Sequence, residues 1–210
     1  MKKKELYSRI ISYFQTSMPV AESELVYDNP FQLLTAVILS AQCTDKRVNM
    51  VTPSLFAAYP TSFAMSSASE ADILSYIKSV SYPNSKAKHL LGMSKMLVEE
   101  YGGEVPDTLE ALVRLPGVGR KTANVVLSVI WQKATFAVDT HIFRVSHRLG
   151  LVDSRATTPY SVEKVLTANF PAELIPIAHH WLLLHGRYVC RAIKPKCAEC
   201  GLSDICKHKM

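Results

Sequence analysis

The sequence has no apolar run long enough to cross a membrane. Its longest apolar segments, FQLLTAVILSA and ANVVLSVIW, have the length of buried helices and fall short of the roughly 18 residues that a span needs. The basic start MKKKELYSRIISYF is not followed by a small-residue cleavage site, so we expect no secretory signal. We also find no internal repeat and no low-complexity tract. These absences predict a folded cytoplasmic protein with no membrane partner.

Strand-like alternation is also nearly missing, being confined to TFAVD, so the sequence predicts an all-α fold. Apolar periodicity predicts helices at about 4–17, 45–58, 84–101, 119–131, 139–149 and 173–185. Capping patterns predict four helix starts, at Asn29 before Pro30, Ser69 with Asp72, Asp107 with Glu110, and Thr158 before Pro159. The segments 30–41 and 119–131 are apolar on nearly every face, which favours packing in one core.

Charge is modest in amount and basic in sign. Among 210 residues, 24 Lys and Arg face 18 Asp and Glu, a balance of +6. This excess is compatible with a polyanionic partner, or simply with a soluble basic surface. The polar break near 131–135 predicts a lobe boundary, and our hypothesis is a two-lobe protein, with one lobe of residues 22–131 and one that joins residues 1–21 to residues 132–210.

The segment LPGVGRKTAN contains two glycines one residue apart, followed by two basic residues. It predicts a helix-hairpin-helix over about 108–131, in which Gly117 and Gly119 supply backbone angles or a close approach that a Cβ would forbid. The turn Gly117, Val118, Gly119 and the following Arg120 would present backbone N–H groups to a phosphate, whatever the base sequence. The alternative is a connector whose glycines serve only geometry.

Two residues near the hairpin are candidates for catalysis. Lys121 falls in the first turn of the second helix, where the helix dipole disfavours the ammonium and favours the nucleophilic amine. Asp139 stands at the entrance of the next helix, where its carboxylate could stabilise positive charge at a sugar carbon. The alternatives are a phosphate-binding or solvent-facing lysine, and an aspartate that only caps its helix.

Four of the five cysteines stand close together near the C-terminus. Cys190, Cys197, Cys200 and Cys206 have the spacing C-x6-C-x2-C-x5-C, which in a reducing compartment predicts a metal site. By spacing alone, zinc and an iron–sulfur cluster are comparable. Residues 184–210 also carry six Lys or Arg against two acids. We expect phosphate contacts from Arg187, Arg191, Lys194 and Lys196, and a helix face of His141, Arg144 and Arg148 that meets DNA or water.

LPGVGRKTANVVL followed by FAVDTHIFRVSHRLG resembles the helix-hairpin-helix DNA glycosylase superfamily and, within it, the endonuclease III family. The similarity extends through NPFQLLTAVILSAQCTD, NSKA, GEVPDTLEALVRLPGVG and HHWLLLHGRYVC to the cysteines, and so covers most of the chain. It implies a monomeric, nucleoid-associated enzyme of base excision repair. Such an enzyme removes damaged, chiefly oxidised, pyrimidines from double-stranded DNA and nicks the strand at the abasic site by β-elimination.

The resemblance also implies roles for single residues. Lys121 is the nucleophile and Asp139 the essential acid, while Gln42 fills the gap left by the flipped nucleotide. An apolar wedge precedes NSKA in the family, which here places Tyr82 beside Pro83. The four cysteines hold a [4Fe-4S] cluster in a loop, 190–206, that meets DNA, and the DNA lies in a groove between the lobes.

Two other functions remain open from the sequence. A monofunctional glycosylase of the same superfamily would share the hairpin, the aspartate and the cluster, but its adenine-specific branch lacks the lysine and carries an acid where this chain has Ala36. A DNA-binding module without chemistry would keep only the hairpin and the cluster. The presence of both Lys121 and Asp139 favours the bifunctional enzyme.

Overall fold

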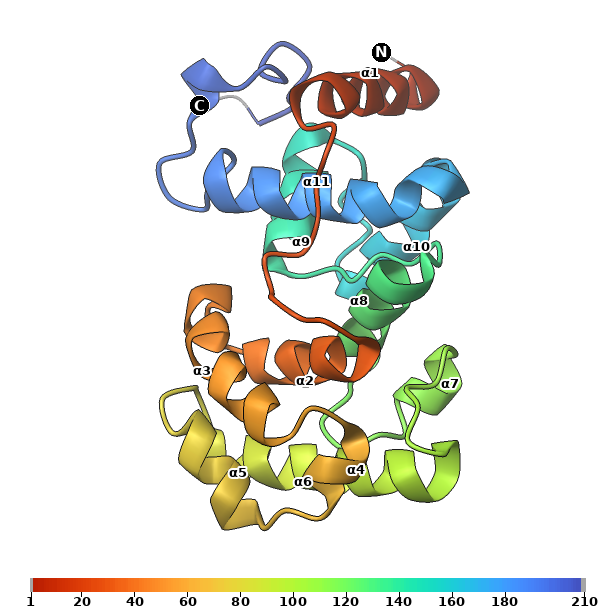
Figure 1. Cartoon of the computed structure of the whole chain (residues 1–210). Coiled ribbons are helices and arrows are strands. Elements are labelled where there is room, and N and C mark those ends of the chain that lie inside the picture. Colours follow the sequence, from red (N-terminus) through yellow and green to blue (C-terminus); the bar gives the residue numbers. More distant parts are fainter. Residues whose placement is uncertain (1, 209–210) are drawn as a thin grey trace. The chain divides into compact units, whose positions relative to one another are not determined.

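A computed structural model of the chain describes residues 2–208, and within this range every regular element is helical (Figure 1). This confirms the all-α prediction. The TFAVD segment, residues 135–139, forms no strand and leads as a loop into the next helix. Residues 1, 209 and 210 of the expected cluster lobe lie outside the described residues. No helix of residues 2–208 is both long and apolar enough to span a membrane.

The backbone contacts divide the chain into two compact units, which we call the hairpin unit and the cysteine unit. The hairpin unit is the continuous segment Ser23–Trp131. Its helices are α2 (Pro30–Ser40), α3 (Asp45–Ala58), α4 (Ser62–Ser66), α5 (Glu70–Ile77), α6 (Pro83–Tyr101), α7 (Leu109–Leu112) and α8 (Arg120–Trp131).

Helix α2 forms the centre of the hairpin unit. Its start follows the expected pattern, because the Asn29 side chain accepts a hydrogen bond from the Gln32 N–H at 2.9 Å and Pro30 occupies the first helical position. Every residue from 31 to 39 is buried. Helices α3, α6 and α8 pack against it, so α2 and α8 share one core as predicted.

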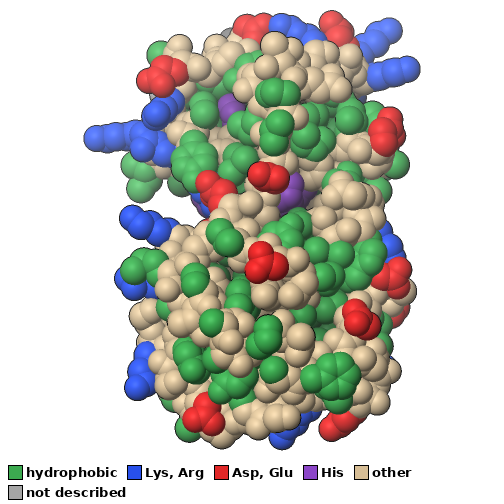
Figure 2. All heavy atoms as spheres, viewed as in Figure 1, with side chains coloured by type: hydrophobic (Ala, Val, Ile, Leu, Met, Phe, Trp, Pro, Cys, Tyr) green, Lys and Arg blue, Asp and Glu red, His purple; other side chains and the backbone are tan. Residues whose placement is uncertain are grey.

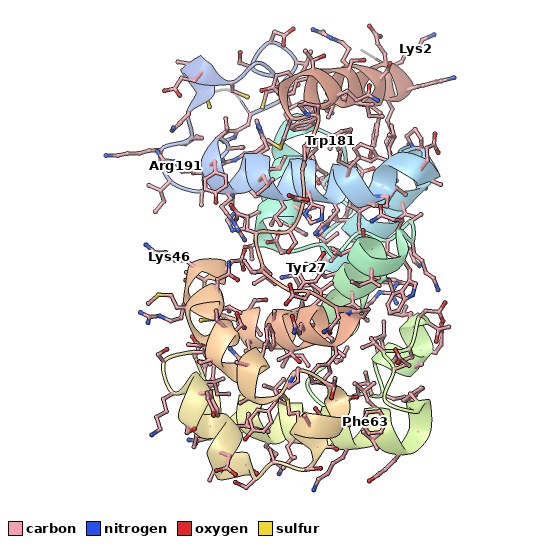
Figure 3. The ribbon with its side chains drawn as sticks, in the orientation of Figure 1. Lys2, Tyr27, Lys46, Phe63, Trp181 and Arg191 are labelled. Carbon is pink, nitrogen blue, oxygen red and sulfur yellow. The ribbon has the colours of Figure 1, made fainter. Side chains whose placement is uncertain are left out.

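The cysteine unit joins Met1–Glu22 to Gln132–Met210. Its core includes Trp181, which Figure 3 labels. Phe14 of the N-terminal helix stacks on Trp181 at 5.7 Å, and Trp181 Nε1 donates to the Met18 carbonyl at 2.8 Å. The elements are α1 (Lys3–Ser17), α9 (Thr140–Leu149), α10 (Pro159–Asn169), the 3-10 turn η1 (Ala172–Leu174), α11 (Ile175–Tyr188) and the 3-10 turn η2 (Cys197–Glu199).

The helix starts mostly agree with the capping patterns. Ser69 and Thr158 each form a capping box with the residue three positions later. Asp107 was the wrong choice for α7, because the N-cap is Thr108, whose Oγ1 accepts from the Ala111 N–H at 3.3 Å. Either residue can cap a helix, and only the backbone path decided between them. The five-residue helix α4 was not predicted, since it is too short for periodicity to reveal.

Candidate active site and metal centre

The hairpin between α7 and α8 depends on Gly117. This residue has φ +80°, and a Cβ there would lie 2.9 Å from the Cβ of His89. Gly119 has no positive φ and no protein neighbour within 4 Å of a Cβ position, so only the close approach of a ligand stays as a prediction for it. The Val118 side chain between them is 7% exposed and anchors the turn in the core. Only the backbone of residue 118 can therefore meet a ligand.

Lys121 lies in the first turn of α8, as predicted, and its side chain is exposed. Arg120 beside it is also exposed. The first N–H groups of a helix have no partner within that helix, and they give its start a positive potential. The helix dipole does not stabilise a lysine at this position. The exposed side chain of Lys121 can meet an anionic or electrophilic ligand.

Asp139 caps helix α9. Its Oδ1 accepts from the Ile142 N–H at 2.8 Å, and the residue is half-buried. The capping role and the catalytic role expected of Asp139 are compatible, because an ionised carboxylate has further lone pairs beyond the one used here. The cap also fixes the position of the carboxylate at the end of the 135–139 loop.

Two further candidates, Gln42 and Tyr82, lie on neighbouring loops of the hairpin unit. Both are exposed, and both have φ 53° although neither is glycine. Gln42 follows the end of α2, and Tyr82 is the N-cap of α6. Ser81 Oγ donates to the Gln42 carbonyl at 2.6 Å and so connects the two loops.

Sequence reasoning missed Lys86, the buried cation beneath these loops. Its Nζ donates to the carbonyls of Leu39 at 2.8 Å and Ala41 at 2.7 Å. A signal was available, since Lys86 occupies the same helix face as the buried Leu90, Met93 and Leu97. A lysine on an apolar helix face has either a buried ammonium with hydrogen-bond partners or a buried aliphatic chain whose ammonium reaches the solvent.

The four clustered cysteines line one cavity of about 310 Å³ in the cysteine unit, together with His185 and Arg148. Burial raises the pKa of the Cys200 thiol, and the neighbouring thiols of Cys190 and Cys206 raise it further. Four thiolates in one cavity need a compensating cation. Within residues 2–208, however, no three His, Cys, Asp or Glu side chains converge as ligands of one ion. Four thiols that line one cavity provide enough ligands for either a zinc ion or an iron–sulfur cluster.

Two arginines of α9 hold the loop that carries the cysteines. Arg144 donates to the carbonyls of Gly186 at 2.8 Å and Cys190 at 3.1 Å, with His141 Nδ1 at 3.2 Å from its guanidinium. Arg148 donates to the Arg191 carbonyl at 2.7 Å. The guanidinium of Arg144 is thus committed to backbone within its unit, while the DNA contacts expected of His141 and Arg144 stay predictions.

The remaining basic candidates lie on or next to the cysteine loop. Arg191 and Lys194 are exposed, and Figure 3 shows Arg191 extending away from the ribbon. Lys194 has φ 50°, and its carbonyl accepts from the Arg191 guanidinium at 3.1 Å. Lys196 forms an ion pair of 3.8 Å with Glu199, and Arg187 is half-buried at the end of α11. On the face in Figure 2, Lys and Arg side chains lie along the margins of each unit.

Comparison with known proteins places this arrangement in context. Residues 35–172 match the family described as HhH-GPD superfamily base excision DNA repair protein. Endonuclease III of Rickettsia conorii is 45% identical over 97% of this chain and 96% of its own length, and that of Bacillus subtilis is 48% identical over 90% and 86%. A solved structure of a trapped endonuclease III–DNA covalent intermediate superposes with a TM-score of 0.92 at 41% identity, covering 99% of this chain and 97% of that one.

Proposed function

The chain belongs to the HhH-GPD superfamily of base excision DNA repair proteins and, within it, to the endonuclease III family, and from this we propose which residues perform the chemistry. The enzyme is a DNA glycosylase and abasic-site lyase that acts on damaged pyrimidines in DNA. We propose Lys121 as its nucleophile and Asp139 as its essential carboxylate. The observation that supports Lys121 most directly is an exposed amine in the first turn of the helix after the hairpin.

In the first step the damaged nucleotide is flipped out of the duplex, and the neutral Lys121 amine attacks C1′ of its deoxyribose. The bond between C1′ and the base breaks, and the base leaves with the electron pair and is protonated. Asp139 stabilises the positive charge that develops on the sugar, since a fixed carboxylate in a protein site needs no reorganisation as that charge appears. Sugar-ring opening then gives a Schiff base between Lys121 and C1′.

The second step cuts the strand. Loss of a proton from C2′ moves electrons toward the iminium, and the 3′ phosphate leaves by β-elimination. Hydrolysis of the remaining imine returns Lys121 as the free amine. The iminium is the electron sink, so these steps consume no oxidant or reductant.

We propose that the DNA backbone is held by the hairpin amides at 117–120. Gly119 supports this, because nothing in the protein requires a glycine there and the open space would admit a phosphate. Gln42 and Tyr82 would enter the duplex where the base leaves. Arg187, Arg191, Lys194 and Lys196 would contact phosphates near the cysteine loop. We place the enzyme, as a monomer, at the nucleoid of the cytoplasm.

We further propose that Cys190, Cys197, Cys200 and Cys206 hold a [4Fe-4S] cluster. The cavity lined by all four thiols supports this assignment. When bound, the cluster supplies structural support to the loop that carries Arg191 and Lys194. Purified protein should contain about four iron and four sulfide per chain, and Cys197→Ser should lose them. One zinc ion per chain would contradict the cluster.

The lysine assignment is tested by trapping. Wild-type protein is incubated with an abasic-site duplex and sodium borohydride, beside Lys121→Gln and the control Lys88→Gln, which removes an exposed lysine from α6. We expect a covalent adduct with the wild type and the control and none with Lys121→Gln. Removal of an oxidised pyrimidine from a second duplex, with no adduct on the abasic-site duplex, would indicate the monofunctional glycosylase. Tight binding with neither activity would indicate the DNA-binding module.

A further inference from the structure

The two exposed loops of the hairpin unit share an unfavourable backbone. Gln42 and Tyr82 both occupy the left-handed region, at φ 53°, which is strained for a residue with a side chain. Tyr82 also precedes Pro83, and a following proline disfavours helical angles. Such conformations persist only where the surrounding structure enforces them. Contacts within the hairpin unit hold these two residues in place.

The Gln42 loop is held from below by the buried side chain of Lys86. Its ammonium donates to the carbonyls of Leu39 and Ala41, at 2.8 and 2.7 Å, where α2 ends. The last carbonyls of a helix lack intrahelical partners and attract a cation. A glycine at position 42 would adopt the left-handed conformation without strain. Lys86 is 6% exposed, and burial lowers its pKa, so this is a costly way to end a helix.

The same residue also holds Tyr82. The backbone N–H of Lys86 donates to the Tyr82 carbonyl at 3.1 Å, one turn earlier in α6. Ser81 Oγ adds the direct bond of 2.6 Å to the Gln42 carbonyl. The backbone of Lys86 thus begins α6 at Tyr82 while its side chain bonds to the end of α2, and Ser81 is bonded directly to Gln42. The contacts bind both loops to one rigid helix start.

We propose that the Lys86 side chain and the Ser81 hydroxyl are positioning groups that together make Gln42 and Tyr82 a single rigid probe of the duplex, which we call the coupled probe. The proposal rests on the proposed function, in which these two side chains enter DNA together. The loops of a rigid pair are already ordered before DNA binds, so little conformational entropy is lost on binding. Both side chains can then replace the flipped nucleotide in one event. Two independently mobile loops would have to be ordered by the DNA.

A double-mutant cycle tests the coupling. Gln42→Ala, Tyr82→Ala and the double variant are made in the wild-type, Lys86→Met and Lys88→Met backgrounds. Met approximates the length of lysine without a donor, and Lys88 is an exposed lysine on the same helix. Single-turnover cleavage of an abasic-site duplex gives the rates. Fluorescence of 2-aminopurine opposite the abasic site reports the insertion itself, independently of chemistry.

In the wild-type and Lys88→Met backgrounds we expect the two substitutions to be coupled by about tenfold, a size usual for residues that act as one unit. In the Lys86→Met background the coupling should fall to about onefold, and the fluorescence change on binding should shrink. Equal coupling in all three backgrounds would overturn the coupled probe alone. Wild-type rates for both single alanine variants would overturn the assignment of these loops in the proposed function, and the coupled probe with it.

Ser81→Ala provides a second test should Lys86→Met fail to fold. It removes only the bond from Ser81 to the Gln42 carbonyl, at the surface of the unit. The loss of one hydrogen bond predicts a fall in coupling of about fivefold. Unchanged coupling in Ser81→Ala would overturn the proposal, because that bond is the shortest connection between the loops.

Discussion

Asp139 caps helix α9 and is also the proposed catalytic carboxylate, and two substitutions can separate these roles. Its Oδ1 caps α9 through the Ile142 N–H at 2.8 Å. Asparagine retains an oxygen that accepts this bond, so Asp139→Asn should lose only the attraction between a carboxylate and the helix dipole, about 0.3–1 kcal/mol. Asp139→Ala loses both terms and should destabilise the protein by about 1–2 kcal/mol. Base excision needs the charge, so both variants should lose about a hundredfold or more in rate.

Urea unfolding and single-turnover excision, measured on the same preparations, give the two quantities. Thr158→Ala is the matched control, because Thr158 caps α10 by accepting from the Ser161 N–H at 3.1 Å and has no proposed role in catalysis. It should lose about 1 kcal/mol of stability and keep its excision rate. An Asp139→Asn protein as unstable as Asp139→Ala would refute the capping argument. Wild-type excision by Asp139→Asn would refute the role of the carboxylate.

Two further predictions follow from the hairpin glycines and from a buried histidine. Gly117→Ala should lower the free energy of unfolding in urea by more than about 1 kcal/mol, because Gly117 has a positive φ and a Cβ there would contact His89. Gly119→Ala should change that free energy by no more than about 0.5 kcal/mol. It should, however, weaken binding to an abasic-site duplex. Equal stability losses would contradict the distinction. Burial lowers the pKa of His180 to about 4, so the unfolded chain takes up its proton first as the pH falls below about 6.5. Stability should therefore fall by up to about 2 kcal/mol between pH 7 and pH 5, and His180→Gln should lack that part of the fall.

The sequence was sufficient for much of the fold and for the family. Helical periodicity, the caps at Asn29 and Thr158, and the apolar segment at the centre of the hairpin unit could be predicted because they depend on neighbours within a few residues. The cysteine spacing and the LPGVGRK segment are likewise local patterns, and the resemblance they carry led to the function.

Only the tertiary structure distinguished residues that the sequence treats alike. Gly117 and Gly119 are equivalent in a motif, yet one meets His89 and the other meets nothing in the protein. Lys86 and Lys88 are two lysines of one helix, and although the apolar face indicates burial for the first, only the position of α2 decides that its ammonium bonds to the carbonyls of Leu39 and Ala41. The partners of a buried side chain lie on elements distant in sequence, and no local pattern encodes them.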